Sequence, residues 1–165
     1  MLEIFPRYGK RITEKAGITG LAAGPNGSLY VAQPNAGLKL GRDGTLTTVA
    51  AAIHLKECDI DYPDHNPQSL MPSLRGIAGD ALGNAFVAAV GCRAVIKIAP
   101  TGKVETILKS ERPWAPTGFA ERAGDIYVLE YTNANGGAGE GWRPRVRKVR
   151  PDGTVAILLT VPQRP

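Results

Sequence analysis

The sequence predicts an all-β fold built from β-propeller blades, each a four-stranded antiparallel meander. A glycine-anchored pattern of short strands recurs three times along the 165 residues, and repeats of about 40 residues with four strands each are typical of propeller blades. No segment shows the sustained 3.6-residue periodicity of an amphipathic helix. A β-sandwich is the rival architecture, but its strands do not normally repeat one glycine-anchored pattern. The repeats therefore favour the propeller.

The first two strands of each repeat follow the same plan. The first strand carries a central glycine and is predicted over 18–22, 74–78 and 116–120. A turn follows, with a glycine at a matching position in each repeat: Gly27, Gly83 and Gly124. The second strand is rich in β-branched and aromatic residues and is predicted over 28–32, 84–88 and 125–129. These two strands predict a tight hairpin at the start of every blade.

A second hairpin completes each repeat. Third strands are clearest over 94–98 and 145–149, and fourth strands are predicted over 46–50, 104–108 and 155–159. The turns between them contain Gly44, Gly102 and Gly153, because a tight hairpin needs a residue with positive φ. The whole chain, 1–165, is expected to form one domain. Its blades are expected over 17–50, 73–109 and 115–161, with 1–16 as part of a preceding blade.

Composition narrows the class of protein. Glycine and proline are frequent, at 20 and 13 residues, which agrees with a chain of many tight turns. The 43% hydrophobic and 21% charged residues exclude wholesale disorder. No apolar run approaches the roughly 18 residues of a membrane span, and the first residues do not read as a signal peptide. The formal charge of +5 permits an acidic partner without requiring one.

The repeats also resemble a known family. Residues 20–31, 76–87 and 118–128, each completed by a glycine-bearing hairpin, look like the blades of NHL-repeat and SMP-30-like six-bladed β-propellers. The resemblance covers about 17–161 and implies half of a six-bladed ring. Either the missing half belongs to a longer chain, or two copies associate to complete the ring as a homodimer. Propellers of this kind include lactonases, lyases and binding modules, so the resemblance does not fix an activity.

Two long connections are expected on one face of the propeller. Strands of a meander alternate in direction, so 51–72 and 132–143 should emerge at the same end of the blades. Long loops in compact domains often carry function. Polar groups beside an aromatic platform suit a carbohydrate or peptide ligand. The candidate ligand-binding residues at this end are Gln33, Arg75, Glu130, Asn133, Trp142 and Arg143.

Acidic side chains gather in the first long connection. Asp59, Asp61 and Asp64 are oxygen donors suited to Ca²⁺, although their spacing is not that of an EF-hand. A solvated loop with Asx turns is the alternative interpretation.

The resemblance to SMP-30-like lactonases implies a divalent metal held at the starts of first strands and the ends of second strands. The matching positions here are Thr19, Arg75, Thr117, Gln33, Ala89 and Glu130. Only Glu130 is acidic, and Arg75 would repel a cation, which disfavours lactonase-type catalysis. The two histidines lack an evident serine or cysteine nucleophile, so no catalytic residue is assigned.

Both cysteines fall at the loop-rich end of the second repeat. Cys58 lies in the connection that enters this blade and Cys92 in the loop after its second strand. A disulfide between them is geometrically reasonable, and two free thiols are the alternative. A disulfide would indicate an extracytoplasmic protein, periplasmic or secreted.

A basic run occupies the third strand of the last repeat. Alternation puts Arg143, Arg145 and Arg147 on one side of the strand and Val146 and Lys148 on the other. Some NHL propellers bind RNA through a basic face. Aromatic residues for base stacking are absent from the run apart from the nearby Trp142. We therefore expect a solvated outer strand whose charges prevent edge pairing, rather than a nucleic-acid site.

The sequence predicts a binding or interaction scaffold that uses its loop-rich face for a ligand or partner. A metal-dependent hydrolase or lyase of SMP-30-like type is the first alternative, using Glu130 and the 59–66 loop, and an RNA-binding NHL module is the second.

Overall fold

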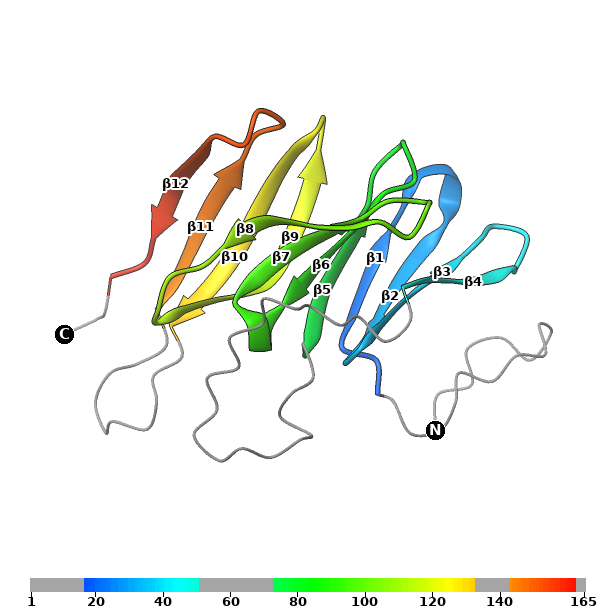
Figure 1. Ribbon diagram of the computed structural model, residues 1–165, viewed down its shortest axis with the longest axis horizontal. Helices are drawn as coiled ribbons and strands as arrows, with labels where there is room; N and C mark the ends of the chain where they lie inside the picture. The colour runs from blue at the N-terminus through cyan, green and yellow to red at the C-terminus, as the bar shows by residue number, and fades with distance from the viewer. Residues whose placement is uncertain (1–16, 51–72, 133–142, 163–165) are drawn as a thin grey trace.

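The computed structural model describes residues 17–50, 73–132 and 143–162. They form three four-stranded antiparallel sheets that stand side by side (Figure 1). Within these ranges only two short 3-10 helices occur, η1 (Pro25–Gly27) and η3 (Val90–Cys92). No helix of the described residues is long and apolar enough to cross a membrane. The all-β propeller-type fold predicted from the repeats is confirmed.

Every sheet pairs its strands in chain order, as a meander requires. Blade one consists of β1 (Gly20–Ala23), β2 (Leu29–Gln33), β3 (Ala36–Leu40) and β4 (Leu46–Ala50). Blade two consists of β5 (Leu74–Gly79), β6 (Ala85–Ala89), β7 (Ala94–Ile98) and β8 (Val104–Lys109). Blade three consists of β9 (Trp114–Arg122), β10 (Asp125–Thr132), β11 (Pro144–Val149) and β12 (Val155–Thr160).

The turn glycines adopt the backbone conformation that the repeats predict. Gly44, Gly102 and Gly153, between the third and fourth strands, have φ of 83°, 83° and 84°. This left-handed region is strained for residues with a side chain, which explains why glycine recurs at each hairpin. The turns between first and second strands use Gly27, Gly83 and Gly124 in the same region.

The blades pack face to face through two apolar clusters. Between blades one and two, Tyr30 and Ala32 of β2 pack against the side of blade two that carries Ile77, Val87 and Ile96. The other side of blade two contributes Phe86, Val95 and Leu108 to a second cluster, which is completed by Ile126, Val128 and Val149 of blade three. Every residue of β6 is consequently buried, because this central strand is covered on both faces.

The first strands of neighbouring blades approach each other closely. β5 lies between β1 and β9 in this inner row. A Cβ atom at Gly20 would overlap the carbonyl oxygen of Arg75, and one at Gly76 would lie 2.7 Å from the Cα atom of Gly118. The glycine of the first strand is therefore the device that lets one blade pack against the next.

Candidate ligand-binding site

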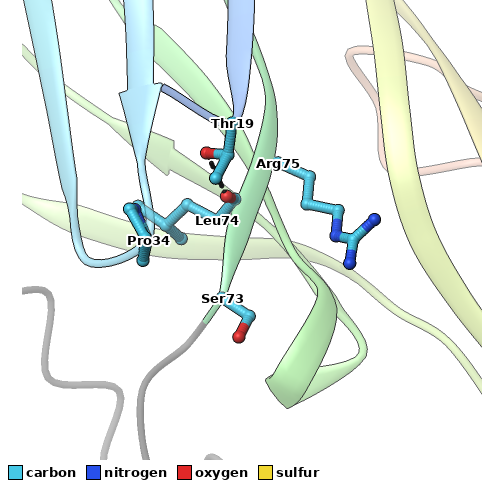
Figure 2. Close-up of a pocket in the computed structure, with 5 residues that line it drawn as sticks. All are labelled: Thr19, Pro34, Ser73, Leu74 and Arg75. Carbon is cyan, nitrogen blue, oxygen red and sulfur yellow. Dashed lines mark hydrogen bonds between the residues drawn. The ribbon is translucent and has the colours of Figure 1, made fainter. Parts of the chain in front are cut away.

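A pocket lies where the first strand of blade two begins beside blade one. The Leu74 amide donates to the carbonyl oxygen of Pro34 at 2.9 Å, and the Thr19 hydroxyl donates to the carbonyl oxygen of Leu74 at 2.6 Å. These bonds join the beginnings of two first strands to the turn after β2. Figure 2 shows the five lining residues of the pocket, which has a volume of about 220 Å³: Thr19, Pro34, Ser73, Leu74 and Arg75.

The pocket combines an apolar wall, two hydroxyls and one charge at its rim. Pro34 supplies the accessible apolar wall, since Leu74 is 0% exposed, and Thr19 and Ser73 supply the hydroxyls. The exposed Arg75 side chain extends away from the other four residues (Figure 2), which leaves its guanidinium free to meet a group outside the pocket. Arg75 is the only ionisable residue among the five that line it.

Ser73 holds an unusual backbone conformation at this pocket. Its φ of 45° lies in the left-handed region, which residues with a side chain seldom adopt. Its carbonyl oxygen accepts a hydrogen bond from the Val90 amide at 3.2 Å. Strained residues of this type gather at binding sites, where the surrounding structure maintains them.

Glu130 forms a separate buried ionic cluster between blades two and three. Its side chain is 0% exposed. Arg145 donates from Nε to one carboxylate oxygen at 2.5 Å, and Arg147 donates from Nη2 to the other at 2.6 Å. The Ser110 hydroxyl also donates to the carboxylate, and Ser110 accepts from Arg147 at 3.2 Å. Because Ser110 follows the last strand of blade two, the cluster ties blade two to blade three.

The strand register explains how the cluster forms. Glu130 on β10 lies opposite Arg145 on β11, and Val128 lies opposite Arg147. Val128 belongs to the cluster that faces blade two, so both arginines project towards the same interface. Arg145 also lies over the Trp114 ring, with its guanidinium carbon 4.1 Å from the ring centre.

The prediction that the basic strand is a solvated outer strand is therefore wrong. β11 is an inner strand of its sheet, between β10 and β12. The side chains of Arg145 and Arg147 are mostly buried, at 12% exposure each, because they neutralise Glu130. The predicted alternation is right, since Val146 and Lys148 point to the opposite face, where Lys148 pairs with Asp125 at 2.5 Å.

The environment keeps Glu130 ionised. Burial by itself would raise the pKa of this carboxyl, but hydrogen bonds from Arg147, Ser110 and Arg145 outweigh burial and hold the pKa below its usual 4.5. Both carboxylate oxygens are already bound by guanidinium groups. Glu130 is thus unsuited to serve as a metal ligand or as a general base.

Stability should depend on the ionisation of Glu130. A carboxyl whose pKa is lower in the folded state stabilises the fold at pH values above its unfolded pKa, near 4.5, and this stabilisation is lost as pH falls through the folded pKa. We expect the urea midpoint to fall between pH 5 and pH 3 by more in the wild type than in Glu130→Gln, which lacks this titration. Equal falls in the two proteins would contradict this assignment.

The structure separates the predicted ligand-binding residues that it describes. Arg75 lines the pocket, and Gln33 is buried beside the lining residue Pro34 without lining the pocket itself. Glu130 belongs to the buried cluster of blade three. Arg143 continues the ladder beyond β11, because its carbonyl oxygen accepts from the Thr132 amide at 3.1 Å and its amide donates to the Thr132 hydroxyl at 3.0 Å.

Several predicted positions lie outside the described residues. They are Asn133, Trp142, Asp59, Asp61, Asp64 and Cys58. Cys92 is buried against the cluster between blades one and two. Its pairing with Cys58 and the extracytoplasmic location stay predictions, as does Ca²⁺ binding by the acidic loop.

The metal site implied by the resemblance does not fit the residues described. Thr19 and Arg75 stand at the starts of β1 and β5, where Arg75 brings a positive charge, and Thr117 lies inside β9. Glu130, the one acidic residue at a matching position, is held by two arginines. The described residues contain no group of three or more histidine, cysteine, aspartate or glutamate side chains placed to hold a metal.

Sequence reasoning missed part of both sites. Pro34, Ser73 and Leu74 line the pocket, yet nothing in their residue types signals this. The partners of Glu130 could have been found, because the predicted hairpin of blade three places the alternating arginines opposite an acidic residue. The burial of that face against blade two would have identified the ion cluster.

Comparison with known proteins supports the fold. No protein-family model and no curated protein matches the chain. Among solved structures, a gluconolactonase from Xanthomonas campestris is 14% identical with a TM-score of 0.60, and the alignment covers 88% of this chain and 48% of that one. A streptogramin B lyase is 19% identical with a TM-score of 0.56, covering 86% and 40% of the two chains.

A third solved structure is also much longer than this chain. The virginiamycin B lyase from Staphylococcus aureus, solved with quinupristin in a catalytically inactive form, is 12% identical with a TM-score of 0.54, covering 89% of this chain and 57% of that one. The chain therefore spans about half the length of the structures it resembles. At these identities the likeness establishes a shared propeller-type fold.

Proposed function

We propose that this chain is a propeller-type binding module whose pocket at the junction of blades one and two takes a small organic acid. The observation that carries this proposal is Arg75, the one charged group of the lining, exposed at the rim of a pocket of about 220 Å³. A guanidinium recognises a carboxylate through paired, charge-assisted hydrogen bonds.

The pocket wall suits the uncharged part of such a ligand. Pro34 offers apolar contact, and the oxygens of Thr19 and Ser73 can meet ligand hydroxyls. The Thr19 hydroxyl already donates to Leu74, so it is oriented to accept from a ligand. A hydroxy acid carries both kinds of group, with its carboxylate directed outward to Arg75.

Calorimetric titration with gluconate, a six-carbon hydroxy acid, tests the proposal against glucose as a neutral ligand of similar size. We expect gluconate to bind more tightly than glucose and Arg75→Ala to weaken gluconate binding about 10- to 100-fold, because a hydrogen bond to a charged group contributes about 1.5–3 kcal/mol. Arg122→Ala is the matched control, since Arg122 is exposed at the opposite ends of the strands. Equal binding of gluconate and glucose would exclude an anion site.

The enzyme alternative remains a second candidate because the gluconolactonase shares the fold. Hydrolysis of gluconolactone, followed in the presence and absence of added divalent metal, separates the two functions. The binding module is expected to leave lactone hydrolysis at its uncatalysed rate. Metal-dependent turnover would establish the enzyme, with catalytic groups other than Glu130.

A further inference from the structure

Among the described residues, no blade packs on the outer face of blade three. This face, here called the open face, is the side of blade three opposite Ile126 and Val128, which pack on blade two. Strand alternation and register assign its residues: Gly118, Tyr127, Leu129, Val146 and Leu159.

Comparison of equivalent positions shows that the open face is built for burial. Leu159 stands six residues after its hairpin glycine, as Leu108 does in blade two. Leu108 is 5% exposed because blade three covers it, whereas Leu159 is 55% exposed. Val155 and its counterpart Val104 are exposed alike, at 42% and 40%. A following blade would cover Leu159 as blade three covers Leu108.

The glycines of the first strands are a second, independent indication that another blade can pack on the open face. Gly20 and Gly76 each lack a side chain where the next blade approaches, and a Cβ atom on either would collide with that blade. Gly118 occupies the same place in blade three, yet a Cβ atom there would have no neighbour within 4 Å. A glycine inside a strand weakens it unless another backbone comes close.

The charge of Lys148 on the open face does not prevent another blade from packing there. Lys148 lies over the Tyr127 ring at 5.5 Å. Blade one repeats this arrangement with Lys39 over Tyr30 at 5.6 Å, and Tyr30 is completely buried beneath blade two. The lysine stem can therefore remain at the rim of an interblade contact while the aromatic ring is covered.

The first strand of blade one carries one exposed apolar side chain that could meet the open face. Leu21 follows Gly20 as Ile77 follows Gly76. Ile77 is 3% exposed in the packed interface of blade two with blade one, but Leu21 is 65% exposed. Blade one thus presents at β1 the apolar residue that, in blade two, packs on the preceding blade.

We propose that the open face of blade three binds blade one of a second copy, with β1 of that copy meeting β9 at Gly118. The contact continues the stacking that already joins blades one, two and three. Under twofold symmetry the junction occurs twice, and the two copies close on each other.

Sedimentation equilibrium of the purified chain over a range of concentrations tests the proposal. We expect a mass twice the 17.5 kDa of one chain. Leu159→Asp should weaken association at least about 100-fold, because it would bury an unpaired charge at both junctions. Val155→Asp, on the same strand, should keep the wild-type mass. A single-chain mass at every concentration, an open series of larger masses, or equal effects of the two aspartates would overturn the proposal.

Gly118→Ala provides a variant that separates association from folding. A Cβ atom at position 118 would have no neighbour within 4 Å in its own chain, so the far-ultraviolet circular dichroism spectrum should stay unchanged while association is lost. Mixing Leu21→Asp with Leu159→Asp should restore some dimer, since such a pair keeps one intact junction. Failure of that mixture to associate, with each variant folded, would also contradict the proposal. The gluconate titration measures ligand affinity rather than mass, so its failure is distinguishable from failure of the association test.

Discussion

Glu130→Ala should lower the free energy of unfolding by about 3–5 kcal/mol, the cost of removing one partner from a buried ion pair. The change leaves Arg145 and Arg147 mostly buried without their carboxylate, and it removes the acceptor of the Ser110 hydroxyl. Since a domain of this size is stable by only about 5–15 kcal/mol, the loss should be evident as a large fall in the urea midpoint.

Two further variants determine whether the penalty comes from unpaired charge. Glu105→Ala removes an exposed glutamate from β8 and should change stability by less than about 1 kcal/mol. Replacing the cluster as a whole, Glu130→Met with Arg145→Met and Arg147→Leu, should restore much of the stability, because no buried charge is left unpaired. A fall below about 1 kcal/mol for Glu130→Ala would show that the cluster does not hold blades two and three together.

Gly20→Ala should destabilise the fold by on the order of 3 kcal/mol, at the upper end of typical overpacking costs. The added Cβ atom would overlap the carbonyl oxygen of Arg75, and backbone cannot rotate away as a flexible side chain can. Relief of the overlap requires β1 and β5 to separate, which opens the contact between blades one and two. Thermal unfolding followed by circular dichroism would measure the loss.

Gly17→Ala is the matched control for this prediction. It makes the same chemical change three residues earlier, where a Cβ atom would have no neighbour within 4 Å. We expect its stability to stay within about 0.5 kcal/mol of the wild type. Similar losses at positions 17 and 20 would mean that close approach of the inner strands is not what requires glycine.

The strand plan could be predicted from the sequence because its signals are local. Each hairpin glycine has the positive φ that its turn requires, and β4 and β6 differ from their predicted limits by at most one residue at either end. β9 begins earlier than predicted, at Trp114, because a bulge between Leu129 and Glu130 lets its pairing with β10 continue.

The candidate sites could be predicted only in part because they depend on contacts between blades. Arg75 was identified from its place at the start of a strand, but the pocket beside it arises where Pro34 and Leu74 meet across two blades. The charge of Arg147 indicated a solvated surface, whereas packing against blade two directs it to Glu130. Residue type gives the charge of a side chain, but the tertiary structure determines which residue it pairs with.

Titration of ¹⁵N-labelled protein with gluconate, followed through backbone amide shifts, tests the proposed binding module most directly. We predict saturable shifts centred on Thr19, Ser73, Leu74 and Arg75, with little change at the Gly153 hairpin and smaller shifts on addition of glucose at the same concentration. Shifts confined to exposed basic residues such as Lys103 and Arg150, or no saturable shift at the pocket, would contradict it.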